Sequence, residues 1–301
     1  MKKTLTTLAI SFVCFCLFSQ SNIRINNFWD NTYYVNPASV TDNCFAEFTM
    51  ATRKQWFNFP GSPTTYFGTA TSYIKRFKAQ VGVKVVQDKT GYTSATDIDF
   101  TYAYATWLDR DWRLHLGIGG SVQTLSYDVS KMVIATSYDP STFDKLLNES
   151  NLNSDIGVEL ASESWTFGAS SQNLLSLFNS INNQFSNTNI VYGTYRQNSK
   201  NLINMGGGIA GIQYGKMYQM ELSVMTYFNA TRERNRFQLG AFYRTKKEMG
   251  VLFGIDLTKT IRLNYSYDYN IGGIGRSSRG TNEIMLVYKP LKNWGCIMCD
   301  Y

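Results

Sequence analysis

The sequence has few of the residues that carry most catalytic and metal-binding chemistry. Its 301 residues include a single histidine, His115, and five cysteines. One histidine cannot form a histidine-based metal cluster, and the chain contains no Gly-x-Ser-x-Gly elbow. Gly206-Gly207-Gly208 is not followed by the Lys-Ser or Lys-Thr of a phosphate loop, so we interpret it as a site of strand bending or close packing. These absences argue against an enzyme, and the sequence predicts no catalytic residue, metal or cofactor.

His115 could in principle act as a general base, but its surroundings favour a different role. It lies in the stretch WRLHLGIGG, where Arg113, His115 and Gly117 share one face of an alternating segment. We therefore interpret His115 as a polar residue that faces the lumen of a barrel.

Long basic blocks are also missing, although the chain is basic overall. Lysine and arginine number 29 against 22 acidic residues, which gives a formal net charge of +7. The basic residues are scattered along the chain, whereas nucleic-acid-binding proteins gather them into a patch or stripe. We expect no nucleic-acid partner.

The only marked apolar run lies at the start of the chain. MKKTLTTLAISFVCFCLFSQ has two lysines, an apolar run from about residue 5 to residue 18, and a small residue at Ser19. These features predict a cleavable signal peptide over residues 1–19, because the run is shorter than the roughly 20 residues of a membrane-spanning helix. Cys14 and Cys16 do not fit a lipoprotein cleavage site.

Three cysteines remain after cleavage in an exported chain, where disulfides can persist. Cys296 and Cys299 are a candidate local disulfide, with two free thiols as the alternative. Cys44 is then unpaired or bonds to one of them. A redox role would require a thioredoxin-type setting, which the sequence lacks.

Aromatic residues and glycine are abundant, and proline is scarce, with 20 Tyr, 19 Phe, 6 Trp, 23 Gly and 5 Pro. The stretch IRLNYSYDYN at residues 261–270 alternates between an Ile/Leu/Tyr face and a polar face. This period of two predicts a β-strand with two environments. We expect the apolar face to meet lipid and the polar face, Arg262, Asn264, Asp268 and Asn270, to line a lumen.

The same alternation recurs along the chain and predicts about fourteen antiparallel strands. Their expected spans are 45–53, 64–76, 79–87, 96–108, 112–124, 153–162, 165–172, 189–197, 203–214, 217–228, 235–245, 248–258, 261–270 and 280–289. Several reach the roughly 9 to 11 residues of a tilted membrane strand. Long connections follow the first, fifth and seventh strands, and short ones follow the second, fourth and sixth, as in barrels with both termini in the periplasm. The connections after the ninth and eleventh strands are shorter than this rule requires, so the agreement is partial.

We therefore predict an all-β fold, a single transmembrane outer-membrane β-barrel. The expected organisation is a signal peptide at 1–19, an N-terminal periplasmic segment at 20–44, the barrel at 45–290 and a periplasmic tail at 291–301. A secreted β-sandwich array would alternate similarly, but no linker or domain-sized repeat occurs. Aromatic residues near the strand ends favour the barrel by resembling interfacial girdles; they are Tyr33, Tyr34, Trp56, Trp107, Trp112, Trp165 and Trp294.

An ordered set of short motifs resembles the PorP/SprF family of type IX secretion and gliding-motility outer-membrane proteins. The set runs from Asn36-Pro37-Ala38, through Arg53-Lys54-Gln55-Trp56 and Gly61-Ser62-Pro63-Thr64-Thr65, to Gly240-Ala241-Phe242-Tyr243-Arg244, Gly254-Ile255-Asp256, Tyr265-Ser266-Tyr267-Asp268-Tyr269 and Asn282-Glu283-Ile284-Met285-Leu286. The chain departs from the family pattern at Asn282, where a histidine is expected, and at the inserted Lys54.

The resemblance implies a non-enzymatic barrel of the Bacteroidota outer membrane that assists export or surface attachment of a secreted protein or adhesin. It also implies a periplasmic partner in the secretion ring or anchored to peptidoglycan, besides contact with outer-membrane lipid. The alternative that the residues leave open is a passive porin or solute-transport barrel, since a polar lumen permits both.

Overall fold

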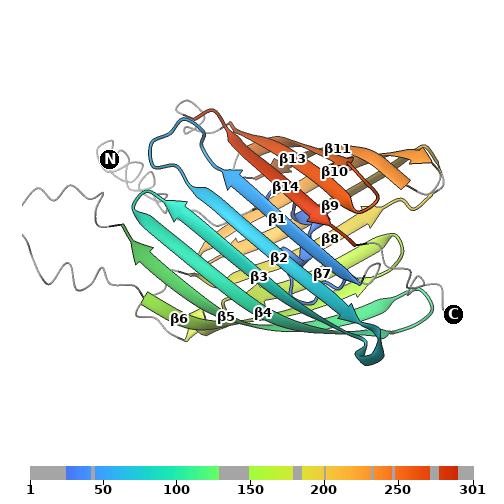
Figure 1. Ribbon diagram of the computed structural model, residues 1–301, viewed down its shortest axis with the longest axis horizontal. Helices are drawn as coiled ribbons and strands as arrows, with labels where there is room; N and C mark the ends of the chain where they lie inside the picture. Colours follow the sequence, from blue (N-terminus) through green and yellow to red (C-terminus); the bar gives the residue numbers. More distant parts are fainter. Residues whose placement is uncertain are drawn as a thin grey trace, which may run out of the picture.

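The predicted β-barrel is confirmed. The computed structural model describes residues 25–41, 45–128, 149–178, 185–199, 201–231, 234–245, 248–271 and 278–290. Within them, fourteen strands form a closed antiparallel barrel in which each strand pairs with its sequence neighbours and β1 pairs with β14 (Figure 1). The strands are β1 (Ala46–Lys54), β2 (Thr64–Ile74), β3 (Ala79–Thr90), β4 (Thr93–Trp107), β5 (Arg113–Tyr127), β6 (Glu149–Ala161), β7 (Trp165–Gln172), β8 (Thr188–Arg196), β9 (Ile203–Tyr214), β10 (Met217–Thr231), β11 (Arg234–Arg244), β12 (Glu248–Asp256), β13 (Ile261–Asn270) and β14 (Thr281–Tyr288).

Alternation along each strand separates an outer from an inner face. On β5, Leu116 and Ile118 are 49% and 62% exposed, whereas His115 is 1% exposed. A closed barrel leaves no unpaired strand edge, so the backbone is satisfied within the wall and the apolar outer face can meet lipid. In the described part of the chain, no helix is long and apolar enough to cross a membrane.

The four longest connections between strands lie at one end of the barrel, which also carries the tight turns 91–92, 215–216 and 245–247. The end that carries the connections 55–63, 128–148, 173–187 and 271–280 is called here the long-connection end. At the opposite, short-turn end lie the connections 75–78, 108–112, 162–164, 197–202 and 257–260, together with the start of β1 and the end of β14. The short 3-10 helices η3 (Lys75–Phe77) and η5 (Leu174–Leu177) lie within connections.

The N-terminal segment lies inside the barrel, which differs from the separate periplasmic segment expected over 20–44. Residues 25–41, called the plug below, include the 3-10 helices η1 (Phe28–Asp30) and η2 (Thr32–Tyr34) and are enclosed by the strands (Figure 1, dark blue). Tyr33 and Tyr34, expected in an interfacial girdle, are 4% and 8% exposed within the plug. The girdle prediction was wrong for these two tyrosines. A tyrosine has an apolar ring and a polar hydroxyl, so it suits a contact inside the lumen as well as a lipid interface.

The plug runs along the lumen from one half of the barrel to the other. At its first residues, Asn26 lies beside Glu283, the register partner of Arg53 near the long-connection end of β1. At its last residue, the Thr41 N–H donates to Gln80 Oε1 (2.8 Å), at the start of β3 on the short-turn end. The expected signal peptide 1–19, Cys44, Cys296, Cys299, Trp294 and the tail 291–301 lie outside the described residues.

Candidate functional site: the plug and the inner wall

The first turn of the plug is held by a buried carboxylate. Glu283 on β14 is 0% exposed and accepts hydrogen bonds from the backbone N–H of Asn26 (2.7 Å) and of Asn27 (3.0 Å), and from Asn27 Nδ2 (2.8 Å). Arg53 Nε lies 3.9 Å from Glu283 Oε2, and Arg53 Nη2 lies 3.6 Å from Asp268 Oδ2. The Glu283 carboxylate therefore binds both the plug backbone and a cation of the wall. These contacts offset the desolvation cost of burying its charge.

A second guanidinium continues this network across the lumen. Arg244 on β11 is 0% exposed; its Nε donates to Glu221 Oε2 and its Nη1 donates to Asn26 Oδ1 (2.9 Å). Glu221 Oε1 in turn accepts the indole N–H of Trp29 (2.9 Å). Glu283 and Glu221 each bind a wall cation and a plug donor, so the plug and the wall share one network of charge-assisted hydrogen bonds.

The middle of the plug is fixed by single hydrogen bonds to several strands. Asn31 Nδ2 donates to Thr69 Oγ1 on β2 (2.9 Å), and the Tyr33 hydroxyl lies 2.7 Å from Thr101 Oγ1 on β4. From β7, Ser170 Oγ donates to the Val35 carbonyl (2.6 Å). These bonds orient η2 in the lumen from two sides of the barrel.

Asn36-Pro37-Ala38, the first family motif, forms a turn against β5 and β6. Asn36 Oδ1 accepts the Ala38 N–H (2.9 Å), while Asn36 Nδ2 donates to the Val158 carbonyl (3.1 Å) and lies 3.2 Å from the Tyr192 hydroxyl. The asparagine thus closes its own turn and also bonds to the wall. Ala38 is 0% exposed.

His115 lies beneath this turn as a buried polar residue of the inner wall. Its Nδ1 is 3.1 Å from Glu159 Oε1, and Glu159 Oε2 accepts the Tyr192 hydroxyl, which also contacts Asn36. The side chain therefore belongs to the layer of wall residues that supports the plug.

Glycines of the inner wall provide the space that the plug occupies. A Cβ added at Gly82 would lie 2.5 Å from Tyr33 Oη, and one at Gly208 would lie 2.6 Å from Trp29 Cζ3. Cβ atoms at Gly117 and Gly157 would collide with the Pro37–Ala38 backbone and with the Asn36 side chain. Wall glycines on four different strands thus let plug and wall approach to backbone contact.

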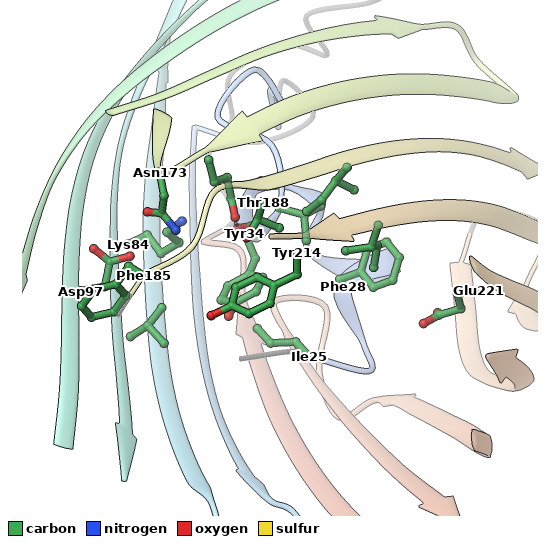
Figure 2. Close-up of a pocket in the computed structure, with 15 residues that line it drawn as sticks. Ile25, Phe28, Tyr34, Lys84, Asp97, Asn173, Phe185, Thr188, Tyr214 and Glu221 are labelled. Atoms are coloured by element: carbon green, nitrogen blue, oxygen red, sulfur yellow. Dashed lines mark hydrogen bonds between the residues drawn. The ribbon is translucent and has the colours of Figure 1, made fainter. Parts of the chain in front are cut away.

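Beside Tyr34 lies a buried lysine with several acids. Lys84 Nζ on β3 is 2.7 Å from Asp99 Oδ2 and 3.8 Å from Asp155 Oδ2, and it lies 5.6 Å from the centre of the Tyr34 ring. A cavity of about 80 Å³ is lined by Lys84, by Ile25 and Phe28 of the plug, and by Tyr214, which lies between Lys84 and Phe28 in the view of Figure 2. No group of three or more His, Cys, Asp or Glu among the described residues is arranged to hold a metal ion.

The four polar residues expected in the lumen all lie on the inner side of β13. Asn264, Asp268 and Asn270 are 0%, 1% and 6% exposed, and Asp268 Oδ2 accepts Asn26 Nδ2 (3.0 Å). Arg262 lies nearer the short-turn end, where its Nε is 2.7 Å from Asp256 Oδ1 and its Nη1 is 3.7 Å from Asp30 Oδ1 of the plug.

The remaining family-motif positions divide between two places. Gln55, Trp56, Gly61, Pro63 and Thr64 shape the β1–β2 connection: Gln55 N–H donates to the Pro63 carbonyl (3.0 Å), and Trp56 and Gly61 adopt φ of 51° and 70°. Tyr265, 38% exposed, points outward, as its alternation predicts. The Tyr265 and Tyr267 hydroxyls donate to Asn282 Oδ1 (2.6 Å) and the Arg279 carbonyl (3.0 Å). The structure brings Arg53, Asp268 and Glu283 together, and the connection reaches this group through Gln55, whose Oε1 accepts Arg53 Nη1 (2.9 Å).

Sequence reasoning missed several residues of the plug interface. Asn26, Asn27 and Trp29 precede the first motif and carry no pattern of their own, and Glu221 looks like an ordinary inner-face charge of its strand. Arg244 appeared only as the last residue of a family motif, with no role assigned to it. A usable signal was present in glycines that fall on polar, inward positions of strands, such as Gly117 beside His115. Their lack of a side chain indicated that something else fills that part of the lumen.

Comparisons with known proteins agree with this architecture. The family described as "Type IX secretion system membrane protein PorP/SprF" matches residues 17–288. Among solved structures, the chain resembles the CymD monoaromatic hydrocarbon channel (TM-score 0.54, 8% identity, 92% of this chain and 96% of that chain). It also resembles the Ralstonia pickettii toluene transporter TbuX (TM-score 0.52, 7% identity, 87% of this chain and 93% of that chain). At these identities the likeness concerns the fold. No curated protein matches the chain significantly.

Proposed function

Since the chain belongs to the PorP/SprF family of type IX secretion system membrane proteins, we propose that it assists the export or surface attachment of a secreted protein or adhesin. In this proposal the barrel works without enzymatic activity in the outer membrane of a Gram-negative bacterium, which it reaches with a cleavable signal peptide at 1–19. Its periplasmic side contacts a secretion-ring or peptidoglycan-anchored protein.

The observation that carries this proposal is the plug. A passive porin needs an open aqueous lumen, whereas residues of the plug bind the inner wall at Glu283, Glu221 and Thr101 and pack on its glycines. An occupied lumen is consistent with a barrel that acts through its two mouths on other proteins.

The direct test is affinity purification of the full-length, tagged protein from the membranes of its native host. We expect co-purification of one secreted surface protein and one periplasmic protein. Recovery of only lipid and unrelated porins would overturn the proposal. A matched purification of an unrelated porin with the same tag identifies proteins that bind any barrel.

The second candidate function is solute transport. The observation that supports it is the cavity of about 80 Å³ between Ile25 and Lys84. Two proteins of similar fold are named for hydrocarbon or toluene transport. Conductance of the purified protein in planar bilayers distinguishes a passive porin from a plugged barrel. An open porin conducts ions, whereas we expect no conductance while the plug is in place. Liposome uptake of toluene, together with no protein partner in the purification, would favour the second candidate.

A further inference from the structure

A wide cavity opens at the short-turn end of the lumen, below the plug. Its volume is about 650 Å³, in the range of sites that hold drug-sized molecules. Trp29 and Asp30 of the plug form one side, and the β12–β13 turn and the ends of β8 and β14 form the other. This cavity is called the vestibule below.

The acidic residues of the vestibule already have cationic or amide partners. Asp256 Oδ1 is 2.7 Å from Arg262 Nε, and Asp30 lies 3.7 Å from Arg262 Nη1 and accepts Gln238 Nε2. Asp256 and Asp30 thus share the single positive charge of Arg262 and keep one net negative charge between them.

Two cations of the vestibule lack such a partner. Lys289 pairs with Glu47 (2.7 Å), but within the described residues no carboxylate lies at ion-pair distance from Arg196 or Lys259. Both are exposed, and Arg196 is held over the Tyr227 ring at 4.2 Å. The uncompensated charge of the vestibule is positive, which attracts anionic groups.

Apolar side chains accompany these cations. Trp29 and Val287 line the same cavity, and Thr258 and Thr260 add hydroxyls at its edge. A bare anion would use only the cations, whereas a peptide segment with acidic and apolar side chains would use the whole lining. Trp29 and Asp30 of the plug and the inward-facing Val287 place the inner part of the vestibule inside the ring of strands, where a peptide can reach it through the mouth of the barrel.

We propose that the vestibule, which opens at the short-turn end that the expected orientation places in the periplasm, binds an acidic peptide segment of a periplasmic partner, with Arg196 and Lys259 as its charge contacts and Trp29 as its apolar contact. This inference rests on the proposed function and specifies how the periplasmic partner is recognised. Because Trp29 and Asp30 belong to the plug, the site is complete only when the plug is in place.

The test measures fluorescence anisotropy of a labelled Asp-Leu-Asp-Leu-Asp peptide with the purified full-length protein in detergent. We expect binding that weakens with salt, and a loss of about tenfold in affinity for the double variant Arg196→Gln/Lys259→Gln, the sum of two exposed ion pairs. The matched control is Arg76→Gln/Lys78→Gln, an arginine over Phe77 and a lysine at the same end of the barrel but outside the vestibule.

Three results would overturn the vestibule site: unchanged affinity in the Arg196/Lys259 variant, an equal loss in the Arg76/Lys78 control, or equal binding of an Asn-Leu-Asn-Leu-Asn peptide. Complete competition by equimolar inorganic phosphate would overturn the peptide assignment. In the native purification, equal recovery of the periplasmic protein by wild type and the Arg196/Lys259 variant contradicts the vestibule but leaves the proposed function standing. Recovery of no partner by wild type contradicts the proposed function itself.

Discussion

The outer and inner faces of the same strands follow different rules. On β5, Ile118 and Gly120 face outward, where Ile118 is 62% exposed and a Cβ at Gly120 would meet nothing within 4 Å. On the inner face of the same strand, Gly117 touches the plug backbone and His115 bonds to Glu159. Positions on the outer face need only an apolar side chain, because lipid is a uniform solvent. Each inner position, by contrast, packs against a particular partner.

Among the substitutions proposed here, removal of the Glu283 carboxylate should cause the largest loss of stability at the inner face. Glu283→Ala deletes the acceptor of three N–H groups in Asn26 and Asn27 and leaves Arg53 with less compensation. We expect a loss of about 3 to 5 kcal/mol, the usual cost of breaking a buried ion pair, measured by urea unfolding in detergent or lipid. We also expect faster proteolysis of the plug.

Glu163→Ala is the control for this variant. Glu163 is an exposed acid in the β6–β7 turn that accepts Asn198 Nδ2 (2.6 Å), so its loss should cost about 1 kcal/mol or less. If the two variants lose the same unfolding free energy, Glu283 contributes no more to stability through the plug than an exposed carboxylate does.

A side chain at Gly117 should displace the plug while one at Gly120 should not. Gly117→Val places methyl groups where the Pro37–Ala38 backbone lies, so we expect a loss of about 1 to 3 kcal/mol from overpacking. We also expect Gly117→Val to conduct ions in planar bilayers, because a plug displaced from β5 leaves the lumen open. Gly120→Val, on the same strand but facing out, should remain closed; conductance in both variants would place the effect in the strand and not in the plug.

Loss of the Asn36 side chain should have a smaller effect than loss of the Glu283 carboxylate, and it should leave the lumen closed. Asn36→Ala removes the cap on Ala38 N–H and the bond to the Val158 carbonyl, a cost of about 1 to 3 kcal/mol. Asn36→Asp keeps the oxygen that accepts from Ala38 but turns a second, charged oxygen without a donor toward the Val158 carbonyl, so we expect it to be less stable than alanine at neutral pH in the same unfolding assay. Aspartate as stable as wild type would contradict the assigned bond to Val158.

These differences explain what the sequence could predict. Fourteen strands and their faces follow from period-two alternation, and even Tyr265 and Asp268 are placed on opposite sides correctly. The plug was not predicted, because residues 25–41 have no periodicity and lie far in sequence from the wall residues that hold them, as with Asn26 and Glu283. Arg53, Asp268 and Glu283 appeared as separate motif positions, and only barrel closure through the β1–β14 pairing brings them together.

The smallest effect is expected on the outer face, at Ile118. Ile118→Leu keeps the apolar volume that lipid requires, and no particular side chain needs to fit against it, so we expect a change in unfolding free energy of about 0.5 kcal/mol or less. Ile118→Arg at the same position should cost about 2 to 4 kcal/mol if it lies near the bilayer midplane. A leucine penalty as large as the Gly117→Val penalty would mean that the outer face also has a specific partner, and the contrast between the two faces would fail.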